Sequence, residues 1–143
     1  NKTLYISHIK YMISNEGLIE FIKILILTII FDTLWFKFAF SNSFYSSINE
    51  LLYNNPNKLI GIFVWFLMTT MQYLFVKPLV NKHSNNIFNV PSSIIYGAIF
   101  GFCIFGIYNG TNLAFIKKWT LRASIIDTLW GTISQSLLAY IIH

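Results

Sequence analysis

Charged residues are scarce in this chain of 143 amino acids. They make up 10% of the sequence, while hydrophobic residues make up 55% and aromatic residues 18%. A soluble globular domain typically carries about 25% charged residues. A single small core could not shield so many apolar side chains from water. The shortage of charge therefore argues against an ordinary soluble domain and indicates an integral, multi-pass membrane protein.

Residues that serve catalysis or metal binding are also few. The chain has one cysteine and three histidines, and none of them has the spacing of a zinc or di-iron site. It lacks a P-loop, a dinucleotide fingerprint, a nucleophile elbow and an HExxH motif. The net charge of +5 is spread over short polar segments, which disfavours nucleic acid and favours anionic lipid headgroups as partners. We expect no metal and no cofactor, and the sequence leans away from an enzyme.

Long apolar runs are what the chain does contain. A membrane helix needs about 20 such residues, and four runs qualify, at about residues 18–38, 58–77, 92–114 and 121–142. Before them, residues 1–16 separate polar from apolar side chains on opposite helical faces, as in an interfacial amphipathic helix. The predicted fold is all-α: a polytopic membrane four-helix bundle over residues 17–143, preceded by that interfacial helix. Lysines flank the runs on both sides, so the positive-inside rule favours neither orientation.

The same tetrapeptide occurs in the first and the last apolar run. It reads Asp32-Thr33-Leu34-Trp35 in one and Asp127-Thr128-Leu129-Trp130 in the other. An aspartate near the middle of a membrane helix costs roughly 2.5 to 3.5 kcal/mol on insertion scales. In a four-helix bundle these two helices are antiparallel, and both acids then lie roughly 9 Å from the same face. The repeat therefore predicts a paired polar site.

The third run ends in polar residues at that same face, and they extend the pair into a predicted buried cluster. Its members are Asp32, Asp127, Asn109, Asn112, Thr111 and Tyr108. Asparagine amides can donate to carboxylates, and two acids in a low-dielectric site tend to share one proton. Such a cluster either fixes the packing of the bundle or binds a ligand or proton, and the sequence leaves both interpretations open.

Aromatic and small residues accompany the cluster. Trp35 and Trp130 each follow their aspartate by three residues, which places each ring near the acid as an interfacial anchor or packing lid. Gly97 and Gly101, and Gly106 and Gly110, are spaced by four residues, which predicts close helix packing. Gly131 in the last run is also expected to be a packing residue.

Several motifs resemble a known family. They are GAIFGF at 97–102, YNGTNLA at 108–114, WTL at 119–121 and DTLWGT at 127–132, together with DTLW at 32–35 and FY at 44–45. In order and spacing they are similar to the predicted membrane proteins called Domain of Unknown Function 2177, over about residues 21–142. The resemblance implies four membrane helices and assigns no activity. The family usually has Asp where this chain has Asn109, and commonly Pro where it has Thr120.

Three functions fit these observations. The small size, the glycines and the missing third acid favour a non-catalytic structural or accessory subunit of a larger membrane assembly, whose partners would be lipids and other membrane subunits. The alternative is a small-solute or proton-coupled transporter that uses Asp32 and Asp127. A lipid-modifying enzyme is a weaker alternative, because it requires both acids to be open to a crevice.

Overall fold

The computed structural model describes residues 14–41, 54–83 and 86–143. Its elements are α2 (Asn15–Ser41), α3 (Lys58–Met71), η2 (Gln72–Val76), α4 (Lys77–Lys82), α5 (Ser92–Phe115) and α6 (Leu121–Ile142). The short π-helix η2 joins α3 directly to α4, which makes one helical rod from Lys58 to Lys82. In the described ranges there is no strand, only an isolated bridge between Ile87 and Val90.

Three of the described helices are long and apolar enough to cross a membrane, judged by length and composition. They are Lys58–Lys82, Ser92–Phe115 and Leu121–Ile142. The all-α membrane fold predicted from the sequence is thereby confirmed. Helix α2 is longer, at 27 residues, but it carries Glu20, Lys23, Asp32 and Lys37, so its crossing of the membrane stays a prediction. The interfacial helix expected at residues 1–16 lies almost wholly outside the described residues.

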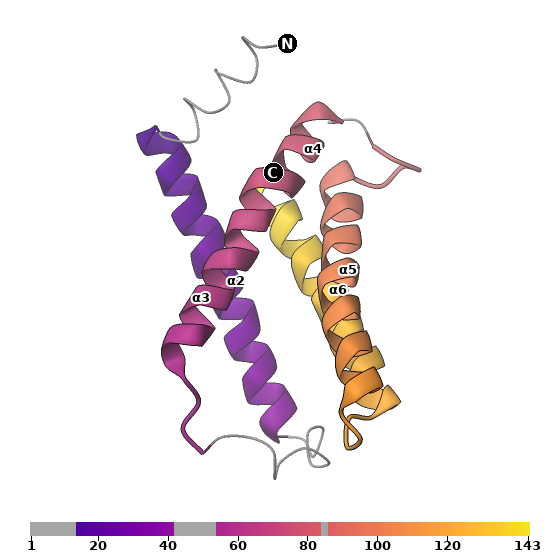
Figure 1. Ribbon diagram of the computed structural model, residues 1–143. Coiled ribbons are helices and arrows are strands. Elements are labelled where there is room, and N and C mark those ends of the chain that lie inside the picture. The colour runs from indigo at the N-terminus through magenta and orange to yellow at the C-terminus, as the bar shows by residue number, and fades with distance from the viewer. Residues whose placement is uncertain (1–13, 42–53, 84–85) are drawn as a thin grey trace.

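The bundle is polar inside and apolar outside. Figure 1 shows α5 and α6 side by side, with α2 and the α3–α4 rod crossing next to them. Large apolar side chains such as Leu59, Phe63 and Phe102 are exposed on the outer surface, whereas Thr69, Gln72 and other polar side chains are completely buried. Lipid tails can surround exposed apolar groups, but they offer polar groups no hydrogen bonds. This distribution suits a bilayer and concentrates the polar chemistry at the centre.

At three glycines, α5 and α6 approach so closely that there is no room for a Cβ atom. A Cβ atom on Gly97 would lie 2.5 Å from the Gln135 carbonyl oxygen, and one on Gly101 would overlap the Gly131 carbonyl. A Cβ on Gly131 would in turn overlap the Phe105 ring. This close approach joins the first half of α5 to the middle and second half of α6.

The other two glycines do not contribute to this contact. Around Gly110 nothing lies within 4 Å of a built Cβ, and Gly106 meets only the Thr128 methyl group, at 3.9 Å. At 3.6 residues per turn, Gly106 is about 140° around the helix from Gly101. The expectation that Gly106 and Gly110 pack like Gly97 and Gly101 is therefore not met within this bundle.

Side-chain caps fix where three helices begin. Ser14 Oγ accepts from the Gly17 amide at 3.2 Å, and Asn57 Oδ1 accepts from the Leu59 amide at 3.0 Å. Before α6, Thr120 Oγ1 accepts from the Ala123 amide at 3.2 Å. Such caps typically stabilise a helix by about 1 kcal/mol. Thr120 thus begins α6 by capping it, at the position where the resemblance implies a proline.

Gly101→Ala is expected to destabilise the bundle, because the added methyl group forces α5 and α6 apart. Overpacking of this kind typically costs about 1–3 kcal/mol. Thermal unfolding of the detergent-solubilised protein measures the effect. Gly110→Ala is the matched control in the same helix, since its Cβ enters open space, and equal losses for both variants would contradict the packing account.

Candidate functional site

The two repeated aspartates meet inside the bundle. Asp32 on α2 is 8% exposed and Asp127 on α6 is 3% exposed. Both side chains line the same pocket. Two like charges brought together in a low-dielectric interior are unfavourable unless other groups compensate for them.

Each carboxylate accepts a hydrogen bond from a different neighbouring helix. Trp65 Nε1 on α3 donates to Asp32 Oδ2 at 2.9 Å. Asn109 Nδ2 on α5 donates to Asp127 Oδ2 at 2.7 Å and to the Phe105 carbonyl oxygen at 2.9 Å. A hydrogen bond to a charged group contributes about 1.5–3 kcal/mol. These contacts join α2 to α3 and α5 to α6, and both donors are neutral side chains.

The pocket beside the aspartates has a volume of about 310 Å³. Apart from the two acids and the Tyr108 hydroxyl, its walls are apolar and mostly aromatic. The lining residues are Asp32, Trp35, Phe36, Val64, Met68, Ile104, Phe105, Tyr108 and Asp127. Pockets with apolar walls and a few convergent polar groups are the usual form of small-molecule sites.

The two tryptophans of the repeat stack on each other. The ring centroids of Trp35 and Trp130 are 5.1 Å apart, and their planes differ by 10°. The stack joins α2 to α6, and the Trp35 ring forms part of the pocket wall. The rings therefore pack against each other at the level of the site.

Of the six predicted cluster residues, three form the buried centre: Asp32, Asp127 and Asn109. Tyr108 is half exposed at the pocket wall and forms a hydrogen bond with Asn112. Thr111 is exposed and does not line the pocket. A position in the last two turns of α5 does not by itself predict burial, because only one face of these turns contacts α6.

Sequence reasoning missed Trp65, the donor to Asp32. A tryptophan in an apolar run has no polar signature, but its position contains a signal. Trp65 precedes Thr69 by four residues, and Thr69 precedes Gln72 by three, so the three side chains share one helical face. Thr69 and Gln72 are both completely buried, and this face is the one that meets the other helices.

A second polar layer lies deeper in the bundle. Gln72 Nε2 on η2 donates to Gln135 Oε1 on α6 at 2.7 Å. Both amides are buried, as are Thr69 and Ser134. Their burial shows that the polar interior extends well beyond the aspartate pair.

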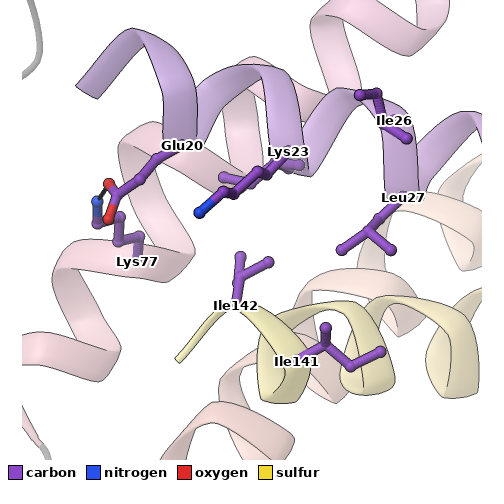
Figure 2. Close-up of a pocket in the computed structure, with 8 residues that line it drawn as sticks. Glu20, Lys23, Ile26, Leu27, Lys77, Ile141 and Ile142 are labelled. Atoms are coloured by element: carbon purple, nitrogen blue, oxygen red, sulfur yellow. Dashed lines mark hydrogen bonds and ion pairs between the residues drawn. The ribbon is translucent and has the colours of Figure 1, made fainter. Parts of the chain in front are cut away.

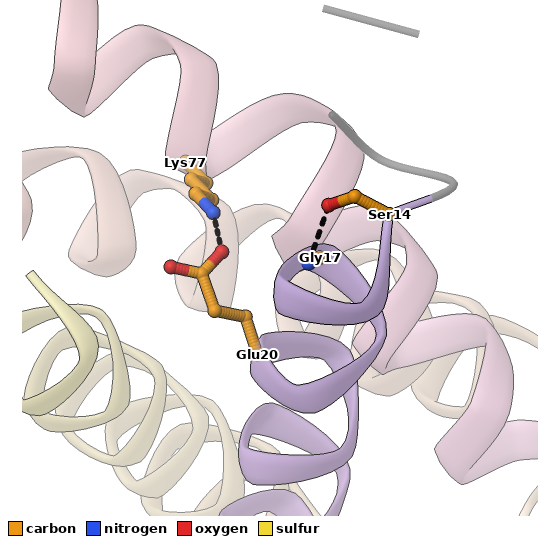
Figure 3. Close-up of polar contacts among 4 residues, drawn as sticks. All are labelled: Ser14, Gly17, Glu20 and Lys77. Carbon is orange, nitrogen blue, oxygen red and sulfur yellow. Dashed lines mark hydrogen bonds and ion pairs between the residues drawn. The ribbon is translucent and has the colours of Figure 1, made fainter. Parts of the chain in front are cut away.

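A second pocket, of about 400 Å³, opens at the other end of the bundle. Figure 2 shows Glu20 and Lys23 of α2 and Lys77 of α4 at one side of it, and Ile141 and Ile142 of α6 at the other. Glu20 and Lys77 form an ion pair that joins α2 to α4 (Figure 3). The Lys77 ammonium also lies 5.0 Å from the centroid of the Tyr73 ring. The described residues contain no group of three or more His, Cys, Asp or Glu side chains that could hold a metal ion.

Apolar helices around a polar interior define the class of this molecule: a small multi-helix integral membrane protein. The chain belongs to the family described as predicted membrane protein (DUF2177), which it matches over residues 17–142. No curated protein and no solved structure matches it.

Asn109→Leu is expected to lower the free energy of unfolding by about 1–3 kcal/mol, since it removes the hydrogen bond that the Asn109 amide donates to the buried Asp127 carboxylate. The double variant Asn109→Leu/Asp127→Leu should lose less than the sum of the two single variants, because neither partner is then left unsatisfied. Thermal unfolding in detergent supplies the values for this double-mutant cycle. Exposed Thr111→Val is the control, and additivity within about 0.5 kcal/mol would refute the coupling.

Proposed function

We propose that this protein is a membrane transporter for a small cationic solute, which binds between Asp32 and Asp127. The observation that carries the proposal is that two buried carboxylates from different helices line one apolar pocket of about 310 Å³. A purely structural pair would be sealed between helices. Here the acids adjoin a space large enough for a small molecule.

The chemistry of the walls supports a cation rather than an anion or a neutral solute. The indole of Trp65 and the amide of Asn109 both donate to the carboxylates, and both groups are neutral. They orient the acids without cancelling their charge. Aromatic walls, including Trp35 and Phe105, add attraction for a cation that carries apolar groups. An organic ammonium ion matches both features.

The position of the acids supports transport rather than simple storage. Ionisable residues inside membrane helices are costly and commonly mark the pathways of solutes, ions or protons. One acid lies on α2 and the other on α6, at the junction of four helices. Movement of one helix pair against the other would therefore change the site, as alternating access requires.

The lipid-modifying enzyme is a less suitable candidate. It requires acids that face an opening, which both do, but it also requires a reacting or positioning group beside them. Among the described residues, those lining the pocket include no Ser, Cys, His or Lys.

A structural or accessory subunit is the second candidate. Gly61 on α3 and Gly110 on α5 leave open space where a Cβ would lie, so another helix could approach closely at either position. This role predicts a stable partner subunit that copurifies with the protein. A monodisperse monomer from native membranes, with no copurifying chain, would count against it.

Tetraethylammonium is expected to bind the purified protein in nanodiscs and to change its tryptophan fluorescence, because Trp35 lies in the pocket wall. Asp32→Asn and Asp127→Asn should each weaken its binding at least tenfold, which corresponds to about 1.4 kcal/mol. Glu20→Gln, at the other pocket, is the control and should bind normally. Equal affinity of all four proteins would overturn the proposed site.

Proteoliposomes that contain the wild-type protein and have an acidic lumen should take up radiolabelled tetraethylammonium in exchange for protons. Asp32→Asn and Asp127→Asn should each abolish this uptake while leaving the elution volume of the purified protein unchanged. Uptake equal to that of protein-free liposomes, in a preparation that binds the cation, would exclude transport but leave binding intact.

A further inference from the structure

Polar residues, most of them buried, continue from the aspartate pair toward the opposite end of the bundle on three elements. Helix α2 contributes the buried Thr28, one turn from Asp32, and the partly exposed Glu20 near its beginning. The α3–η2–α4 rod presents Thr69, Gln72, Tyr73 and Lys77, and α6 presents Ser134 and Gln135. From Asp32 to Glu20 the helix rises roughly 18 Å. We refer to these eight residues, Thr28, Glu20, Thr69, Gln72, Tyr73, Lys77, Ser134 and Gln135, as the polar file.

Several atoms of the polar file lack the partners that burial demands. Thr69 Oγ1, Gln72 Oε1, Tyr73 OH and Gln135 Nε2 are buried and have no hydrogen-bond partner among the described residues. In a membrane each unsatisfied polar group costs several kcal/mol. The four atoms come from adjacent turns of two facing helices, and a chain of water molecules between those helices would satisfy them together.

The backbone is irregular at this place. Residues Gln72–Val76 form the π-helix η2, and both Gln72 and Tyr73 belong to it. Single-turn π-helices within α-helices are uncommon and are frequently found at functional sites. In this protein the wider π-helical turn contains two consecutive residues of the polar file, Gln72 and Tyr73.

An apolar layer interrupts the polar file between the glutamines and the ion pair. Ile24 and Leu138 are completely or almost completely buried there, and they pack with Tyr73 in one cluster. Tyr73 is the member of this cluster that carries a hydroxyl group. Beyond it lie Lys77, whose ammonium contacts the Tyr73 ring, and the pocket at Glu20 that Figure 2 shows.

We propose that the polar file is a hydrated proton path that connects the aspartate pocket with the Glu20–Lys77 pocket. The Tyr73 hydroxyl group transfers protons across the apolar layer. The inference rests on the proposed function, since it supplies the proton that exchanges with the cationic solute at Asp32 and Asp127. The Tyr73 hydroxyl oxygen accepts the excess proton from a hydronium ion on one side, while its own proton passes to a water molecule on the other. The hydroxyl is regenerated when it reorients, so no charge accumulates on it.

The decisive variant is Tyr73→Phe, which removes the hydroxyl group and keeps the ring. Proton movement driven by a tetraethylammonium gradient is measured with pyranine inside proteoliposomes, and the variant should slow it at least tenfold. Its affinity for tetraethylammonium should stay within twofold of wild type. Tyr140→Phe, in an exposed position on α6, is the matched control and should change neither quantity. Proton movement at the wild-type rate in Tyr73→Phe, with binding intact, would overturn the path and leave the proposed site standing.

A second pair of variants applies the same test if Tyr73→Phe does not fold. Thr69→Val removes a buried hydroxyl that has no partner among the described residues. Its neighbour Thr70 donates to the Phe66 carbonyl at 2.7 Å and is not completely buried, so Thr70→Val is the control. The expected result is slower proton movement in Thr69→Val alone. Equal rates for both variants would contradict the path.

Hydroxyl-radical footprinting in nanodiscs tests the water chain without any solute, and so separates it from the proposed function. Radicals formed from internal water should label Tyr73 at a rate typical of exposed tyrosines such as Tyr140, although Tyr73 is buried. Leu138, in the apolar layer, supplies the rate for a dry position. If Tyr73 is labelled as slowly as Leu138, the polar file is dry and the inference fails, whether or not tetraethylammonium binds.

Discussion

A helix inside a bilayer can satisfy its polar side chains only through the protein or through water held inside it, because lipid tails neither donate nor accept hydrogen bonds. The arrangement of this chain follows from that constraint. Asp32 and Asp127 turn inward to the indole of Trp65 and the amide of Asn109. For the same reason, the buried amide of Gln72 donates a hydrogen bond to that of Gln135 one layer deeper. The apolar side chains are left on the surface, so the centre of the bundle is its most reactive region.

Sequence periodicity predicted the fold well, because the bilayer imposes strong rules on length and composition. The matching depth of Asp32 and Asp127 on antiparallel helices predicted that they share one site, and both line one pocket. Finer details depended on rotation about each helix axis, which spacing alone does not determine. Gly106 and Gly110 repeat the spacing of Gly97 and Gly101 but face elsewhere. Thr111 lies two residues after the buried Asn109 in sequence, yet its side chain is exposed.

Trp65 illustrates a different limit. An indole is counted as apolar when a membrane helix is sought, so its N–H donor was overlooked, although it orients one of the two central acids. At Asn109 the resemblance implied an acid, and the chain has an amide that donates to Asp127. A carboxylate at this position could not donate that hydrogen bond. Replacing the third acid therefore changes the site from three acceptors to two acceptors with a fixed donor.

The glycine contact between α5 and α6 has a mechanical consequence. Backbone against backbone leaves no room for sliding, so these two helices behave as one stiff unit. Helix α2 and the α3–α4 rod are instead attached to their neighbours through long side chains, including Trp35, Trp65 and the Glu20–Lys77 pair. Asp127 thus lies on the stiff α5–α6 unit, and Asp32 lies on the less tightly packed helix α2. A movement of α2 relative to that unit would change the separation of the two carboxylates.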